Sequence, residues 1–313
     1  MMLNLSEVES LLITGSNGFV GRSVVEKISE LEATNLPKQI IVLTRNGINY
    51  EIPESISGRT KFTTHDLTKP WLFDMKPTHI INLAADGSRH PYSEEANTTI
   101  TMIARNLIEW VSSTGIKPKI FHASSGACFG YKPLNPSQRT ENSKSAFIKS
   151  RIEVENLLIS RSESGAFDLV IGRLFTFSGK NLLHKNQYAI TDFIKSAVND
   201  GKIQVNGNPN TVRSFMHQAA MAHWILQTLN TEDYGFDLQI GSSEAVTISE
   251  LAEYVASETS VHVEYSRNLQ DGDVYLPDNS STKTKLGLDE GLHWKLAVRE
   301  MVETVRMGKD VKR

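Results

Sequence analysis

The chain has 313 residues, of which 39% are hydrophobic and 22% are charged, a balance typical of a globular protein with a full core. Its formal net charge of −3 at pH 7 gives no electrostatic basis for binding nucleic acid. The single cysteine, Cys128, excludes an intrachain disulfide, and no apolar run approaches the roughly 18 residues that span a bilayer. We therefore expect a cytoplasmic protein that binds neither nucleic acid nor a membrane.

A glycine-rich turn follows the first apolar run of the chain, residues 11–13, and leads into a segment whose apolar residues recur at helical spacing. This order predicts a strand, a tight turn and a helix. Three glycines there would allow the sharp turn, the close approach of backbone to a ligand, and tight helix–strand packing, while the helix N-terminus would meet a pyrophosphate. The stretch predicted to bind a dinucleotide comprises Gly15, Ser16, Asn17, Gly18, Phe19, Val20 and Gly21.

Strand and helix signals alternate through the first half of the chain, which predicts a parallel sheet with crossover helices. The second predicted strand, 39–45, ends in Thr44 and Arg45, where an NAD-binding protein usually carries Asp or Glu. A guanidinium pairs with a 2′-phosphate that a carboxylate would repel, so the sequence favours NADP over NAD. The alternative is that Arg45 points into solvent.

Three further predicted strands end in residue pairs at the edge where open α/β sheets bind ligands. These pairs are Asp66 and Leu67, Ala84 and Ala85, and Ser124 and Ser125. A carboxylate at Asp66 would lie near an adenine amino group, although an exposed turn residue is the alternative. Small side chains at Ala84 and Ala85 would let the backbone pass close to a coenzyme.

The alternation becomes less regular beyond Gly179, which indicates a second, smaller lobe. Helices are predicted over 189–199, 219–229 and 294–305, a helix opened by a capping box at 247–250, a short strand over 237–241 and another over 262–265. We expect a dinucleotide-binding domain at 1–176 and a mixed α/β substrate lobe at 177–313, part of which returns to the first domain.

Together these stretches resemble the extended short-chain dehydrogenase/reductases, and more narrowly the NAD-dependent epimerase/dehydratase family that modifies nucleotide sugars. The resemblance rests on residues 14–21, 66–67, 82–85, 124–130, 172–175, 213–217 and 240–252, in the family's order. It implies a Rossmann-type doubly wound parallel sheet, NADP or NAD as coenzyme and a nucleotide sugar as substrate. It also implies a homodimer formed through the helices near 97–113 and 147–160.

The resemblance also implies a role for each matching residue. The glycines would hold the pyrophosphate, Asp66 and Leu67 would border the adenine, and Ala84 and Ala85 the nicotinamide. Ser124 would act on the substrate near its reacting carbon, with Ser125 beside it. Arg213 and Arg267 would bind the diphosphate, because a planar fork of donors matches phosphate oxygens.

The family's chemistry usually rests on Tyr-x-x-x-Lys, and here the chain departs from the pattern. Ser150 and Glu155 fix the register, so Phe147 stands at the tyrosine position and Arg151 at the lysine position. Phe147 has no proton to exchange, and losing a positioned acid/base usually costs about 10²–10⁴ in rate. Arg151 keeps the positive charge that would contact the nicotinamide ribose.

Two functions therefore stay open. The first is a nucleotide-sugar reductase or epimerase in which Tyr131, or else His90 or Tyr92, transfers the proton. The second is a catalytically degenerate protein that binds dinucleotide and nucleotide sugar in a regulatory or scaffolding role. No His, Cys, Asp and Glu cluster has metal-ligand spacing, no Gly-x-Ser-x-Gly elbow is present, and 124–126 lacks the Thr-Asp-Glu of the dehydratase branch.

Overall fold

The computed structural model describes residues 3–85, 93–129, 146–184, 188–231, 237–266 and 272–310. A seven-stranded sheet, in which every pairing is parallel, forms its centre, with the order β11-β6-β5-β4-β1-β2-β3. The strands are β1 (Ser10–Thr14), β2 (Gln39–Thr44), β3 (Thr60–Thr64), β4 (His79–Asn82), β5 (Lys119–Ser125), β6 (Asp168–Leu174) and β11 (Leu238–Ile240). The chain runs outward from β1 to β3 and then returns to the other side of β1, which confirms the predicted doubly wound sheet and places a switch point between β1 and β4.

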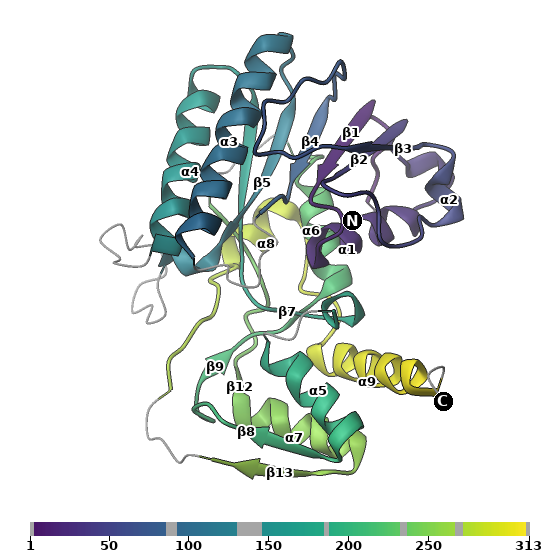
Figure 1. The fold of residues 1–313 in the computed structure, drawn as a ribbon, viewed down its shortest axis with the longest axis vertical. Coiled ribbons are helices and arrows are strands. Elements are labelled where there is room, and N and C mark those ends of the chain that lie inside the picture. The colour runs from purple at the N-terminus through teal and green to yellow at the C-terminus, as the bar shows by residue number, and fades with distance from the viewer. Residues whose placement is uncertain are drawn as a thin grey trace.

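Helices cover both faces of this sheet (Figure 1). In β1 the side chains alternate, so Leu12 packs under α3 and α4 while Leu11 and Ile13 belong to the core beneath α1 and α6. The covering elements are α1 (Phe19–Ser29), η1 (Ala33–Asn35), α2 (Glu54–Ser57), α3 (Glu94–Thr114), η2 (Gly126–Phe129), α4 (Ala146–Glu163), α6 (Gln218–Gln227) and α8 (Ser280–Leu286). Helix α3 begins one turn before the predicted residue 97, because the Ser93 hydroxyl caps it by accepting from the Ala96 N–H.

The remaining elements form a smaller lobe, seen below the sheet in Figure 1. They are β7 (Phe177–Ser178), η3 (Lys180–Leu182), α5 (Ala189–Asp200), β8 (Lys202–Val205), β9 (Val212–Arg213), β10 (Met216–His217), β12 (Val246–Thr247), α7 (Ile248–Thr259), β13 (His262–Tyr265) and α9 (Trp294–Asp310). Its strands pair two by two, β7 with β10, β9 with β12 and β8 with β13. The capping box between Thr247 and Glu250 opens α7 as predicted.

Two elements from the second half of the chain pack on the first. Strand β11 pairs with β6 and so completes the main sheet, and α6 packs against α1. The second half therefore returns to the sheet after forming part of the smaller lobe. None of the helices within the described ranges has the length and apolar character needed to cross a bilayer.

Candidate active site

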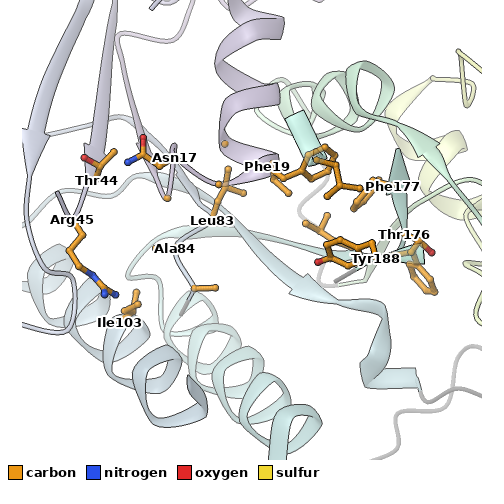
Figure 2. A pocket seen from close by; sticks show the side chains of 18 of the residues that line it. Asn17, Phe19, Thr44, Arg45, Leu83, Ala84, Ile103, Thr176, Phe177 and Tyr188 are labelled. Atoms are coloured by element: carbon orange, nitrogen blue, oxygen red, sulfur yellow. The ribbon is translucent and has the colours of Figure 1, made fainter. Parts of the chain in front are cut away.

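A cavity of about 800 Å³ opens at the carboxyl ends of β1, β2 and β4 (Figure 2). Residues of the smaller lobe complete its wall. The size of the cavity suits a dinucleotide-sized ligand. The predicted residues that line it are Gly15, Asn17, Gly18, Phe19, Val20, Gly21, Arg45, Asp66, Leu67, Ala84, Ala85 and Arg213. Ser16, also predicted to bind the dinucleotide, is fully buried beside the turn and is not one of the lining residues.

The glycine turn has no room for side chains at two positions. A Cβ on Gly15, whose φ is +69°, would lie 2.8 Å from the Leu83 carbonyl oxygen, and a Cβ on Gly21 would lie 2.5 Å from the Gly15 carbonyl oxygen. Gly18 is the N-cap of α1 and donates its own N–H to the Gly15 carbonyl at 3.0 Å. The turn therefore presents bare backbone at the start of a helix, which fits a pyrophosphate.

A chain of buried hydrogen bonds fixes the backbone that leads into Ala84 and Ala85. The Thr14 hydroxyl accepts from the N–H groups of Leu83 and Ala84, both at 3.2 Å, and donates to Asn82 Oδ1 at 2.8 Å. Asn82 Nδ2 then faces His122 Nδ1 at 3.1 Å, which assigns the proton of a neutral imidazole to Nε2. Burial lowers the pKa of His122 to about 4, so the ring is neutral near pH 7.

Arg45 and Asp66 bring a cation and a carboxylate to the cavity wall at the ends of β2 and β3. Arg45 is exposed and lines the cavity, and Figure 2 shows its side chain extending from the end of β2 on the side of Ile103. Asp66 accepts from the Thr68 N–H at 3.1 Å and from its hydroxyl at 2.8 Å, and these bonds lower the pKa of Asp66. The Asp66 carboxylate is therefore ionised and held in place.

The hydroxyls of the two serines at the end of β5 form hydrogen bonds with other groups of the protein. Ser124 is 7% exposed and donates to Glu155 Oε1 at 2.5 Å, while the Ser125 hydroxyl accepts from the Ala127 N–H at 3.2 Å. Neither serine is among the residues that line the cavity. The Ser124 hydroxyl proton is therefore directed at a buried carboxylate, and the contact of Ser124 with substrate stays a prediction.

Glu155 also holds a buried arginine that the sequence reasoning missed. Arg173, on β6, donates from Nε to Glu155 Oε1 at 3.0 Å and from Nη2 to Oε2 at 2.8 Å, and it contacts Asp237. Glu155 and Arg173 are both buried, at 0% and 1% exposure respectively. An arginine inside the apolar run 168–175 was the signal, since such a charge needs a buried partner.

Phe147 and Arg151 contact each other at the start of α4. The Arg151 guanidinium lies 3.8 Å from the centre of the Phe147 ring, a cation–π contact, and its Nη1 donates to the Ser150 hydroxyl at 3.3 Å. Neither residue is among those lining the cavity. The positions of the family's tyrosine and lysine therefore hold a stacked pair.

Tyr188 is a phenol on the cavity wall that the sequence reasoning missed. It is the one tyrosine among the described lining residues. Tyr188 is also the N-cap of α5, and its backbone carbonyl accepts from the N–H groups of Thr191 and Asp192, both at 3.0 Å. Figure 2 shows its ring near the labelled Phe177 and Thr176. The expected proton donors Tyr131, His90 and Tyr92, and the expected phosphate ligand Arg267, lie outside the described residues.

Arg213 reaches the cavity from β9 as part of an ion pair. Its Nη2 lies 3.0 Å from Asp273 Oδ2, and the Thr211 hydroxyl donates to Asp273 Oδ1 at 3.1 Å. A phosphate would therefore meet a guanidinium that already has a carboxylate partner. In the described part of the chain, no three His, Cys, Asp or Glu side chains are grouped so as to hold a metal ion.

Comparison with known proteins places this geometry in context. UDP-glucuronic acid decarboxylase 3 of Arabidopsis thaliana is 23% identical over 321 residues, covering 97% of this chain and 91% of the relative. UDP-glucuronic acid decarboxylase 1 of Danio rerio is 20% identical, covering 93% and 72%. These relatives are enzymes, which supports an enzymatic function for this chain.

Solved structures share the fold. The UDP-glucose 4-epimerase of Thermotoga maritima with UDP-glucose has a TM-score of 0.79 at 18% identity, covering 96% of this chain and 99% of that one. RMD from Pseudomonas aeruginosa complexed with NADPH has a TM-score of 0.77 at 15% identity, covering 96% and 98%. The model of the NAD dependent epimerase/dehydratase family matches residues 11–241, and the chain belongs to that family.

Proposed function

We propose that this protein is a nucleotide-sugar reductase or epimerase that uses NADP in preference to NAD and has an atypical active site. One observation supports the proposal above the others: a single cavity joins the glycine turn and Arg45 on one side to Tyr188 and Arg213 on the other. A reaction between a dinucleotide and a diphosphate-linked sugar needs one part of the cavity for the coenzyme and another for the sugar nucleotide.

The residues present fit the coenzyme. Gly15 and Gly21 leave backbone where side chains would clash, Asp66 is fixed near the adenosine end, and Arg45 supplies a cation for a 2′-phosphate. The dinucleotide supplies hydride-transfer chemistry when bound. The chain's own task is to bind it, to orient the sugar and to hold a proton at the reacting oxygen.

We assign that proton to the Tyr188 hydroxyl, because Phe147 has none and Tyr188 lies on the cavity wall. Tyr131 is the alternative donor. Tyr188→Phe should lower kcat about 10²-fold or more while leaving the Kd for UDP within about twofold of wild type. If Tyr131→Phe gives that pattern and Tyr188→Phe does not, the proton belongs to Tyr131.

The second candidate is a catalytically degenerate binding protein with a regulatory or scaffolding role. The stacking of Arg151 on Phe147 favours it, since this contact occupies the positions of the family's acid/base pair. The cavity and its glycine turn serve binding without turnover equally well.

Binding and turnover measurements on the purified protein separate these outcomes. Calorimetric titration with NADPH and with NADH should give binding of both, with NADPH tighter. Mixing with NADPH and a 4-keto nucleotide sugar should then lower the nicotinamide absorbance. An epimerase regenerates its coenzyme and gives no net oxidation, so isomerisation of a UDP-hexose is followed as well. Binding with neither oxidation nor isomerisation favours the second candidate, and no affinity for either coenzyme contradicts both. Light scattering on the same sample tests the homodimer expected through α3 and α4.

A further inference from the structure

The loop that follows β2 is held to the glycine turn by the side chain of Asn17, which lines the cavity, and by that of Arg22, which does not. We propose that Arg22 and Asn49, which would not touch the coenzyme, are positioning residues that set the preference for NADP by holding Arg45 over the adenosine ribose. The proposal rests on the coenzyme-binding part of the proposed function and does not depend on turnover.

The first set of hydrogen bonds comes from the side chain of Asn17, a residue of the glycine turn. Its Nδ2 donates to the Gly47 carbonyl at 2.7 Å, and its Oδ1 accepts from the Asn49 N–H at 3.3 Å. One amide thus binds two backbone groups of the loop. Gly47 has a φ of +86°, which turns the chain sharply after Arg45.

The second set of hydrogen bonds comes from Arg22, on the first turn of α1. Its Nη2 donates to Asn49 Oδ1 at 2.7 Å and to the Asn49 carbonyl at 3.3 Å, and its guanidinium lies 5.1 Å from the centre of the Tyr50 ring. The Arg22 N–H bonds the Gly18 carbonyl at 2.9 Å, so the backbone of Arg22 is tied to the glycine turn itself. Neither Arg22 nor Asn49 is among the residues lining the cavity.

Arg45 and Asn46 are the loop residues that do line the cavity. They lie between β2, which is fixed in the sheet by pairing on both sides, and Gly47, which is fixed by Asn17. The segment that carries the Arg45 cation is therefore anchored at both ends. Releasing the far end would let an exposed arginine move away from the ribose.

Polar side-chain atoms are buried where the loop after β2 meets the glycine turn, which we call the junction, and burying them reduces the stability of the fold. Among the described residues, Arg22 Nε has no hydrogen-bond partner, and the buried hydroxyls of Ser16 and Tyr50 have only each other. Unpartnered buried polar atoms destabilise a fold, and their retention at a ligand-binding turn indicates that the junction serves binding.

The consequence differs between the two coenzymes. NADPH carries the 2′-phosphate that Arg45 would meet, and NADH carries a hydroxyl there, so only NADPH depends on where the guanidinium lies. Loosening the loop should weaken NADPH and spare NADH. Damage to the glycine turn itself would weaken both, because both contain the pyrophosphate.

The test measures the Kd of NADPH and of NADH by calorimetry for wild type, Arg22→Ala, Asn49→Ala and the reference variant Arg45→Ala. Arg22→Ala and Asn49→Ala should each weaken NADPH about fivefold to twentyfold and NADH less than about twofold. Asn49→Ala removes only one of the contacts that Arg22→Ala removes. The double variant should therefore bind NADPH no more weakly than Arg22→Ala does. Arg22→Lys keeps a donor for Asn49 and should retain most of the preference.

Lys27→Ala is the matched control, because it removes one positive charge from the same helix and breaks only an exposed pair with Glu30. It should leave the NADPH-to-NADH ratio unchanged. Asn49 is exposed, so Asn49→Ala tests the proposal even if Arg22→Ala fails to fold. An unchanged ratio in Asn49→Ala, or equal weakening of both coenzymes, overturns the inference. A wild-type protein that binds neither coenzyme would instead overturn the proposed function.

Discussion

Glu155 is fully buried, and its carboxylate accepts hydrogen bonds from Arg173 and from Ser124. Glu155→Gln would leave the Arg173 guanidinium without its buried counter-charge, and only the exposed Asp237 carboxylate would still pair with it. We expect the free energy of unfolding to fall by about 3–5 kcal/mol, which is typical for breaking one side of a buried pair. Urea unfolding followed by circular dichroism measures it.

Removing the other partners of this carboxylate gives the controls. Ser124→Ala should cost about 1–2 kcal/mol of stability and leave NADPH affinity unchanged, because the serine bonds a buried acceptor and not the cavity. The double variant Glu155→Leu with Arg173→Met should recover much of the loss. A Ser124→Ala protein of normal stability and no activity would instead support the substrate contact that the family resemblance implies.

His122 makes the stability of the protein dependent on pH. Burial lowers the pKa of His122 from 6.5 to about 4 in the folded protein. Between these two pH values the imidazole is protonated in the unfolded chain and neutral in the folded one. The stabilisation is complete above pH 6.5 and is lost as the pH falls towards 4. From pH 7 to pH 5 we expect this residue to reduce the free energy of unfolding by about 2 kcal/mol.

Urea unfolding at both pH values, in wild type and in His122→Gln, isolates this contribution. Gln offers an oxygen to Asn82 and does not titrate, so its loss of stability over the same interval should be smaller by that amount. Equal losses in the two proteins would show that His122 is protonated in the folded state or not buried.

At the level of elements, the strand β9 presents Arg213 to the cavity together with its partner Asp273. Asp273→Asn would remove the carboxylate that competes with a bound phosphate for the guanidinium. We therefore expect UDP to bind about threefold to tenfold more tightly to this variant, as measured by calorimetry. Arg213→Ala is the comparison and should bind UDP more weakly. Weaker binding in Asp273→Asn would mean that the ion pair orients Arg213 for the ligand.

Local pattern was enough to predict which residues at the ends of β1, β2 and β4 line the cavity, whereas their binding of a coenzyme stays a prediction. The glycine spacing at 15–21, the strand ending in Arg45 and the small residues at Ala84 and Ala85 all act through backbone within a few residues, and the cavity contains all of them. The hydroxyl of Ser124 was different, because its direction depends on Glu155, 31 residues further along the chain. Tyr188 likewise reaches the cavity only through the packing of the smaller lobe on the sheet.

For the whole molecule, Glu26 on α1 ties the two halves of the chain together beside the glycine turn. Glu26 Oε2 accepts from Asn181 Nδ2 at 2.8 Å and from Gln218 Nε2 at 3.2 Å, and Lys180 pairs with the same carboxylate group at 2.5 Å. The segment leading into the smaller lobe is thus fixed to the helix that would hold the pyrophosphate. If the cavity holds the two proposed ligands, residues from the sheet would contact the coenzyme and residues from the smaller lobe would contact the nucleotide sugar.

Hydrogen exchange with mass spectrometry can therefore map the two ligands separately. NADPH should slow exchange in the glycine turn and in residues 44–49, because the proposed coenzyme contacts lie there. UDP should slow exchange in α5 near Tyr188, which lies away from Asn17 and Arg45 in Figure 2, and around Arg213. Inorganic phosphate at the same concentration is the control and should protect neither region to the same extent. If UDP protected the glycine turn and left α5 unchanged, the nucleotide would occupy the coenzyme half, and the assignment of Arg213 to the substrate would be wrong.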